Sequence, residues 1–206
     1  LITDLLFNNA MYIIIAIAVI FIAIKVPAFL SVSSIVNIVS LTAAKLPIAL
    51  GIAGCIVLTG TDISAGRCVG LTACVAASLL QMTGYANKMF PNLNTMPLIV
   101  VFLAVIAIGA VVGLVNGFFV AKFKLHPFIV TLSTQLIVFG LVLMYLMLGG
   151  NNGQTLSGLD SSYTDFVRGT LFKIGDVAIP KYVLYSLILT GIMWIIWNKT
   201  KFGKNM

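Results

Sequence analysis

Glutamate is absent from the 206 residues, and aspartate occurs five times. Histidine occurs once, and charged residues make up only 8% of the chain. No set of His, Asp and Glu therefore exists for acid–base or metal chemistry, and the sequence has neither a phosphate-binding glycine loop nor a nucleophile elbow. These absences argue against an enzyme, and we expect no metal site and no cofactor on this chain.

Cysteine is also scarce. Cys55, Cys68 and Cys74 lie in apolar runs, at spacings that match no zinc or redox motif. We expect free, buried thiols that pack as small hydrophobic side chains. The basic residues, which give a net charge of +7, are not interleaved with aromatic residues, so we expect no nucleic-acid partner.

Hydrophobic residues make up 61% of the chain and gather in long uncharged runs, as in a protein that crosses the membrane several times. The runs are apolar on all faces without two-residue alternation, which favours helices over a barrel. We therefore expect an all-α integral membrane bundle with one domain over residues 1–206. The expected spans are residues 5–24, 34–60, 63–84, 96–121, 127–148 and 182–198, with a polar external loop at 149–181.

Residues 59–70, TGTDISAGRCVG, join two of these runs and contain the charged pair Asp62 and Arg67. Charged side chains beside membrane-length segments need a role, such as a helix cap, a packing contact or a permeation path. We expect Asp62 to cap the third helix and Arg67 to face a polar partner. Within the second span, Pro47 predicts a kink or a break.

Small residues recur every four positions in two of the runs. They are Gly66, Gly70, Cys74 and Ser78 in the third run, and Gly109, Gly113 and Gly117 in the fourth. Such a stripe lets a second helix approach closely, so we expect tight packing, with a pathway lining as the alternative. Asn116 lies beside the second stripe and needs a hydrogen-bond partner at that depth, which we expect on a neighbouring helix rather than along an aqueous path.

Two stretches carry a family resemblance. GTDISAGRCVGL at residues 60–71 resembles the signature of sugar-importing ABC permeases of the branched-chain-amino-acid/ribose class. GAVVGLVNGFFVAKFKLHPFIVTLST at residues 109–134 resembles the second hallmark of that class. Arg67 and ANKMFPNLNTMP at residues 86–97 look like its galactose/methyl-galactoside branch. The chain departs from the pattern at Ser133 and Gln135.

The resemblance implies the type II ABC importer permease fold and candidate residues for the path or its signature. They are Asp62, Ser64, Gly66, Arg67, Asn116, Gly117, Pro127, Phe128 and Thr131. WNKTKFGKNM at residues 197–206 looks like the approach to a cytoplasmic coupling loop, with Lys199, Lys201, Phe202, Gly203 and Lys204 as its candidate residues. Members of the class continue through that loop and further spans, so the resemblance implies that the chain is C-terminally incomplete relative to the family.

The resemblance also implies the partners and the place of the protein. A second permease copy, cytoplasmic ATPase subunits that hold ATP and Mg²⁺, and a periplasmic or lipid-anchored sugar-binding protein would assemble in the bacterial cytoplasmic (inner) membrane. The permease would form the translocation path without bond-making chemistry. A secondary transporter or channel for a small solute is the alternative, although it would want intramembrane acidic residues and only Asp62 is a candidate.

The lysines predict that both chain ends are cytoplasmic, because the tight clusters at 122/124 and 199/201/204 then lie inside. Single-cysteine variants Gln154→Cys and Lys201→Cys, made without the native cysteines, test this in intact cells. An impermeant maleimide should label the first variant and not the second. Labelling of Lys201→Cys from outside would show that the C-terminal end is not cytoplasmic and would contradict this topology.

Overall fold

The computed structural model describes residues 9–175 and 177–205, and most of them are helical. The apolar helices are α2 (Ala10–Lys25), α3 (Val32–Val57), α4 (Ala65–Leu79), α5 (Leu98–Phe123), α6 (Pro127–Leu146) and α8 (Lys181–Lys199). The shorter elements are η1 (Pro27–Leu30), α7 (Ser161–Arg168), β1 (Thr170–Ile174), β2 (Val177–Pro180) and α9 (Lys201–Asn205). The fold is that of an α-helical membrane protein.

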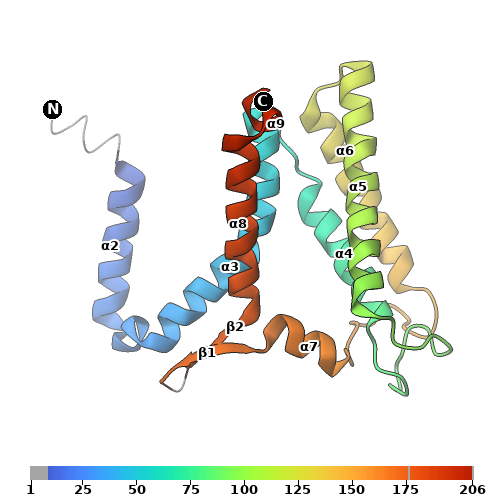
Figure 1. Cartoon of the computed structure of the whole chain (residues 1–206), viewed down its shortest axis with the longest axis horizontal. Helices are drawn as coiled ribbons and strands as arrows, with labels where there is room; N and C mark the ends of the chain where they lie inside the picture. The colour runs from blue at the N-terminus through green and yellow to red at the C-terminus, as the bar shows by residue number, and fades with distance from the viewer. Residues whose placement is uncertain (1–8, 176, 206) are drawn as a thin grey trace.

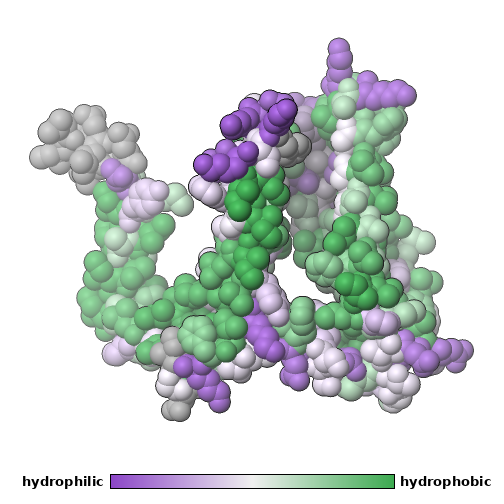
Figure 2. Space-filling view, viewed as in Figure 1, coloured by the Kyte–Doolittle hydropathy of each residue, from purple (hydrophilic) through white to green (hydrophobic). Residues whose placement is uncertain are grey.

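Four of these helices, α3, α5, α6 and α8, are long and apolar enough to cross a membrane. Figure 2 shows the exposed apolar sides of α5 and α8 as green columns between hydrophilic ends. Only 6% to 17% of the most apolar window in each helix is buried within the chain. The remaining faces are therefore available to lipid or to further protein.

The helices form two packing units. In the first, α3 packs against α8, and their buried contact consists of Val36, Ala43, Ile179 and Val183. In the second, α4, α5 and α6 pack against one another. Figure 1 shows α2 beginning and α8 ending on the same side, with α7 and the strands on the opposite side.

Helix α3 contains Pro47 but continues from Val32 to Val57, so the proline does not break it. Figure 1 shows α3 changing direction along its length, as expected where proline removes one intrahelical hydrogen bond. The sequence prediction of a kink or a break is thus resolved as a continuous, bent helix.

The connection from α3 to α4 differs most from the expected spans. Residues 58–64 are not helical, and they run down beside the helices before α4 begins (Figure 1). Helix α4 has 15 residues. It is therefore about 22 Å long, shorter than a hydrocarbon core of about 30 Å. Non-helical backbone at membrane depth persists only where protein or a cavity satisfies its polar groups.

The polar region on the far side is folded. Strands β1 and β2 pair antiparallel, where the sequence indicated only a polar loop. Residues 80–97 pack against residues 147–160 around Gln81, which is fully buried. Its amide donates to the carbonyl of Ser157 (3.0 Å) and accepts from the N–H of Met89 (2.9 Å), and so joins two loops that are far apart in the chain.

Replacing Gln81 should destabilise this region. Gln81→Leu leaves the buried Met89 N–H and Ser157 C=O without partners, at a cost of about 1–3 kcal/mol each at most. We expect reversible unfolding in mild detergent to show a loss of a few kcal/mol, with Thr83→Val as the control because the hydroxyl of Thr83 bonds Thr95 on the surface. Equal stability of the two variants would contradict the role of Gln81.

Candidate functional site

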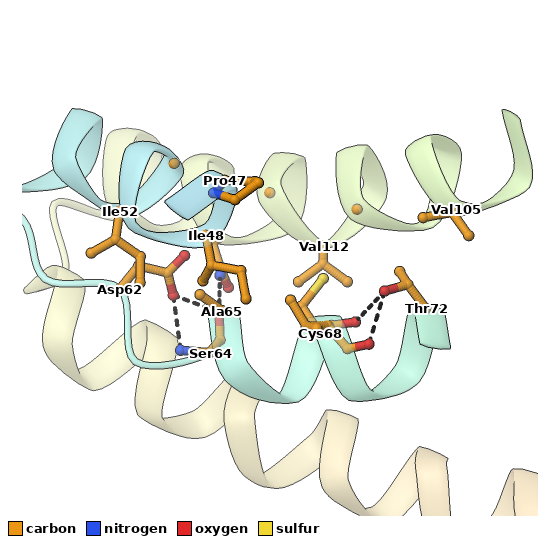
Figure 3. Close-up of a pocket in the computed structure, with 15 residues that line it drawn as sticks. Pro47, Ile48, Ile52, Asp62, Ser64, Ala65, Cys68, Thr72, Val105 and Val112 are labelled. Carbon is orange, nitrogen blue, oxygen red and sulfur yellow. Dashed lines mark hydrogen bonds between the residues drawn. The ribbon is translucent and has the colours of Figure 1, made fainter. Parts of the chain in front are cut away.

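A cavity of about 420 Å³ lies between the two packing units. Its walls come from α3, α4 and α5, and Ile48, Val105 and Val112 make much of its surface apolar (Figure 3). Asp62, Ser64, Thr72 and Asn116 bring polar groups to the same cavity. An apolar cavity of roughly 300–1,000 Å³ with a few placed polar groups is typical of small-molecule sites.

Asp62 lies in the non-helical segment before α4, half-buried at the cavity wall. Its Oδ1 accepts hydrogen bonds from the backbone N–H of Ser64 (2.8 Å) and from the Ser64 hydroxyl (2.6 Å). Ser64, not Asp62, occupies the N-cap position of α4. The expected cap is therefore corrected: Asp62 closes a turn that leads into the helix.

A directed chain of hydrogen bonds leads to this carboxylate. The Thr134 hydroxyl donates to Asn116 Oδ1 (2.6 Å), and Asn116 Nδ2 donates to Ser64 Oγ (3.0 Å). The Ser64 hydroxyl then donates to Asp62. We call Thr134, Asn116, Ser64 and Asp62 the polar relay. It confirms the prediction that Asn116 bonds a neighbouring helix, because the amide joins α6 to the start of α4.

Thr131 holds the same segment from α6. Its hydroxyl donates to the carbonyl of Thr61 (3.1 Å) and accepts from the N–H of Ile63 (3.3 Å). Thr131 is 5% exposed, so water cannot easily replace these bonds. A Cβ on Gly60 would lie 3.5 Å from Pro127 Cβ, which places the segment against the start of α6. Phe128, the next residue, is exposed.

The contact that Arg67 makes differs from the polar partner that the sequence predicted. Its guanidinium lies over the ring of Phe139 on α6, 4.3 Å from the ring centroid, rather than beside a polar partner. Arg67 is exposed, and no ion pair joins it to Asp62 among the described residues. The planar guanidinium is weakly hydrated and stacks well on an aromatic face. The sequence lacked a signal for this pairing, because the two residues are far apart in the chain.

The glycine stripes do not form close helix contacts within the described chain. A Cβ added at Gly66, Gly70, Gly109, Gly113 or Gly117 would meet no atom within 4 Å. Gly109 and Gly113 instead line the cavity. Gly66, Gly70 and Gly117 do not line the cavity, and Ser78 at the end of the first stripe is fully buried beside the Tyr145 hydroxyl (2.6 Å). Tight packing of the glycines against another helix stays a prediction.

The residues near the C-terminal end lie apart from the cavity. Lys199 ends α8, with its ammonium 5.9 Å from the ring centroid of Trp194. Lys201, Gly203 and Lys204 belong to the short helix α9, and both lysines are exposed. The side chain of Phe202 lies outside the described residues. These positions place positive charge at one end of α8, where Figure 2 shows hydrophilic colour.

Sequence reasoning did not assign three residues to the cavity or the polar relay: Thr134, Pro47 and Thr72. Thr134 was not singled out, although it lies one turn from Thr131 on α6, and this spacing could have indicated a shared polar face. Pro47 and Thr72 line the cavity from α3 and α4. Gln135, noted only as a departure, has a buried Oε1 without a hydrogen-bond partner among the described residues.

The polar groups at the cavity wall donate and accept hydrogen bonds. No group of three or more His, Cys, Asp or Glu side chains gathers anywhere in the described residues. The fold and cavity define an α-helical membrane protein with a polar relay beside a cavity of small-molecule size.

The chain matches the family described as branched-chain amino acid transport system / permease component over residues 34–206. This match covers most of the chain, so the chain belongs to that family. The galactose/methyl galactoside import permease protein MglC of Escherichia coli K12 is 42% identical over 97% of this chain. The MglC protein of Salmonella typhimurium is 43% identical over the same share.

The ribose import permease protein RbsC of Haemophilus influenzae is 29% identical over 86% of this chain and 50% of its own length. The chain spans 58% of the length of the two MglC proteins. No solved structure is significantly similar to the chain.

The hydroxyl of Thr131 provides a test of the segment geometry. Thr131→Val keeps the side-chain shape but removes the bonds to Thr61 and Ile63, and should cost about 0.5–2 kcal/mol of unfolding free energy. Thr42→Val is the matched control, because the exposed Thr42 hydroxyl bonds only the Ile38 carbonyl of its own helix. Equilibrium unfolding in detergent measures both. A loss at Thr42 as large as that at Thr131 would show that the segment does not depend on this contact.

Proposed function

We propose that this chain forms the membrane-spanning part of an ATP-driven sugar importer of the galactose/methyl galactoside type. The observation that carries the proposal is the graded similarity to named permeases. Identity is 42% and 43% to two galactose/methyl galactoside import permeases, against 29% to a ribose and 26% to a D-allose permease.

The structure supports a passage role rather than catalysis. Its cavity is open between two helix units and has a few hydrogen-bonding groups in a mostly apolar wall, and its apolar helices suit a bilayer. ATP and Mg²⁺ would be held by cytoplasmic ATPase subunits. A sugar-binding protein would deliver the solute to the outer face, and a second permease copy would complete the membrane unit in the bacterial cytoplasmic membrane.

The basic C-terminal end suits the cytoplasmic side of such an assembly. Lys199, Lys201 and Lys204 lie at the end of α8 and on α9, on the same side as the start of α2. Positive charge of this kind marks cytoplasmic loops. The ATPase would then meet the chain at this end, and the folded polar region around Gln81 would face the binding protein.

Reconstitution tests the proposal. The complete reading frame that contains this chain is placed in proteoliposomes with its ATPase and sugar-binding protein. We expect uptake of labelled methyl galactoside that requires ATP on the side of the membrane where the ATPase lies. Galactose should compete with this uptake more strongly than ribose does. Uptake driven by an ion gradient without ATP would instead support a secondary transporter and overturn the proposal.

A further inference from the structure

One carboxylate oxygen of Asp62 accepts hydrogen bonds from the protein, and the other accepts none among the described residues. Oδ1 receives both bonds from Ser64. Among the hydrogen bonds of the described residues, none involves Oδ2. Figure 3 shows the second oxygen turned away from Ser64, toward the side of the cavity formed by α3. Among the described residues only Gln135 Oε1 is a buried side-chain oxygen or nitrogen without a partner, so Oδ2 is open to the cavity and can accept a hydrogen bond from water or from a solute.

The polar relay fixes which oxygen faces the cavity. The three hydrogen bonds that link the relay residues all run toward Asp62: Thr134 donates to Asn116, Asn116 to Ser64, and Ser64 to Asp62. Ser64 is 1% exposed and Asn116 8% exposed, so neither is free to turn into solvent. The carboxylate therefore presents Oδ2 as a fixed acceptor, and rotation of its side chain would break two bonds at once.

The surroundings restrict what can bind this acceptor. A hard cation wants six or more oxygen ligands, and no group of three acidic, His or Cys side chains exists among the described residues. An anion would be repelled by the carboxylate. A neutral molecule with several hydroxyl groups and an apolar C–H face matches both the acceptor and the walls made by Ile48, Ile52 and Val112.

We propose that Asp62 Oδ2 is the hydroxyl-binding point of a solute subsite, within this one chain, for a neutral polyhydroxylated solute of monosaccharide size. Ser64, Asn116 and Thr134 are positioning residues that act through Asp62. The inference rests on the proposed function, which it deepens by naming the residue that holds the solute. Gly109 and Gly113 leave the volume that the solute would occupy.

The native cysteines allow a direct test. Cys68 and Cys74 are both half-buried and lie on the same helix, α4. Cys68 lines the cavity, and Cys74 does not. The chain is prepared in lipid nanodiscs as Cys55→Ser/Cys74→Ser, which leaves Cys68, and as Cys55→Ser/Cys68→Ser, which leaves Cys74. The rate of maleimide labelling is measured with and without methyl galactoside.

We expect methyl galactoside to slow labelling of Cys68 and to leave labelling of Cys74 unchanged. Asp62→Asn should raise the half-protecting concentration about tenfold, because an amide NH2, which can only donate, replaces the charged acceptor Oδ2 and removes the charge-assisted hydrogen bond. The Asn oxygen still accepts from Ser64, so the turn is kept. Asp160→Asn is the matched control: Asp160 caps α7 through Ser162 in the same way, away from the cavity.

A second variant keeps the proposal testable if Asp62→Asn folds poorly. The double change Gly109→Ala/Gly113→Ala adds two methyl groups to the cavity, where no atom lies within 4 Å, and should weaken protection without disturbing the helix. Gly140→Ala on α6 is its control, because that position is equally open but not part of the cavity lining.

Several results would overturn the subsite. If maleimide does not label Cys68 even when no solute is present, the cavity is closed or filled by protein. Protection by sodium or potassium chloride instead of the sugar would identify a cation site. Absent protection, or protection unchanged by Asp62→Asn, would remove Asp62 from solute binding. These results leave the ATP-driven uptake assay unaffected, so failure of the subsite and failure of the proposed function can be told apart.

Discussion

The arrangement of this protein depends on one interaction, the bond from Asn116 on α5 to Ser64 at the start of α4. The chain between α3 and α4 leaves the helical state beside apolar helices, where unsatisfied backbone groups are costly. Asn116 and Thr131 provide side-chain partners for that segment from two different helices. Without them, the end of α3 and the start of α4 would have no fixed position against α5 and α6.

From this anchoring follows the shape of the cavity. The segment at residues 58–64 joins the unit of α3 and α8 to the unit of α4, α5 and α6. Because the segment is held against α5 and α6, the two units stand apart at the glycines of α5 and leave about 420 Å³ between them. The same contacts orient the carboxylate of Asp62 at the wall of that space.

The sequence predicted the parts of this structure that depend on local composition. Long uncharged runs indicated helices, and the lone amide of Asn116 indicated an interhelical bond. The partner of that amide could not be predicted, because Ser64 is 52 positions away and many hydroxyl groups were available. The stacking of Arg67 on Phe139 was missed for the same reason.

The spacing of Gly109, Gly113 and Gly117 shows only that the residues on one helix face are small, not whether a second helix covers that face. The β1–β2 pair was missed because its strands have five and four residues, too few for a clear alternating pattern.

A double-mutant cycle between Ser64 and Asn116 tests the central claim most directly. Unfolding free energies are measured in detergent for Ser64→Ala, Asn116→Ala and the double variant. If the buried bond holds the segment, the two changes should be non-additive by about 0.5–2 kcal/mol, as for interacting groups in a membrane protein. Additive losses would show that Asn116 and Ser64 stabilise the protein independently, and would contradict this account of the segment and its cavity.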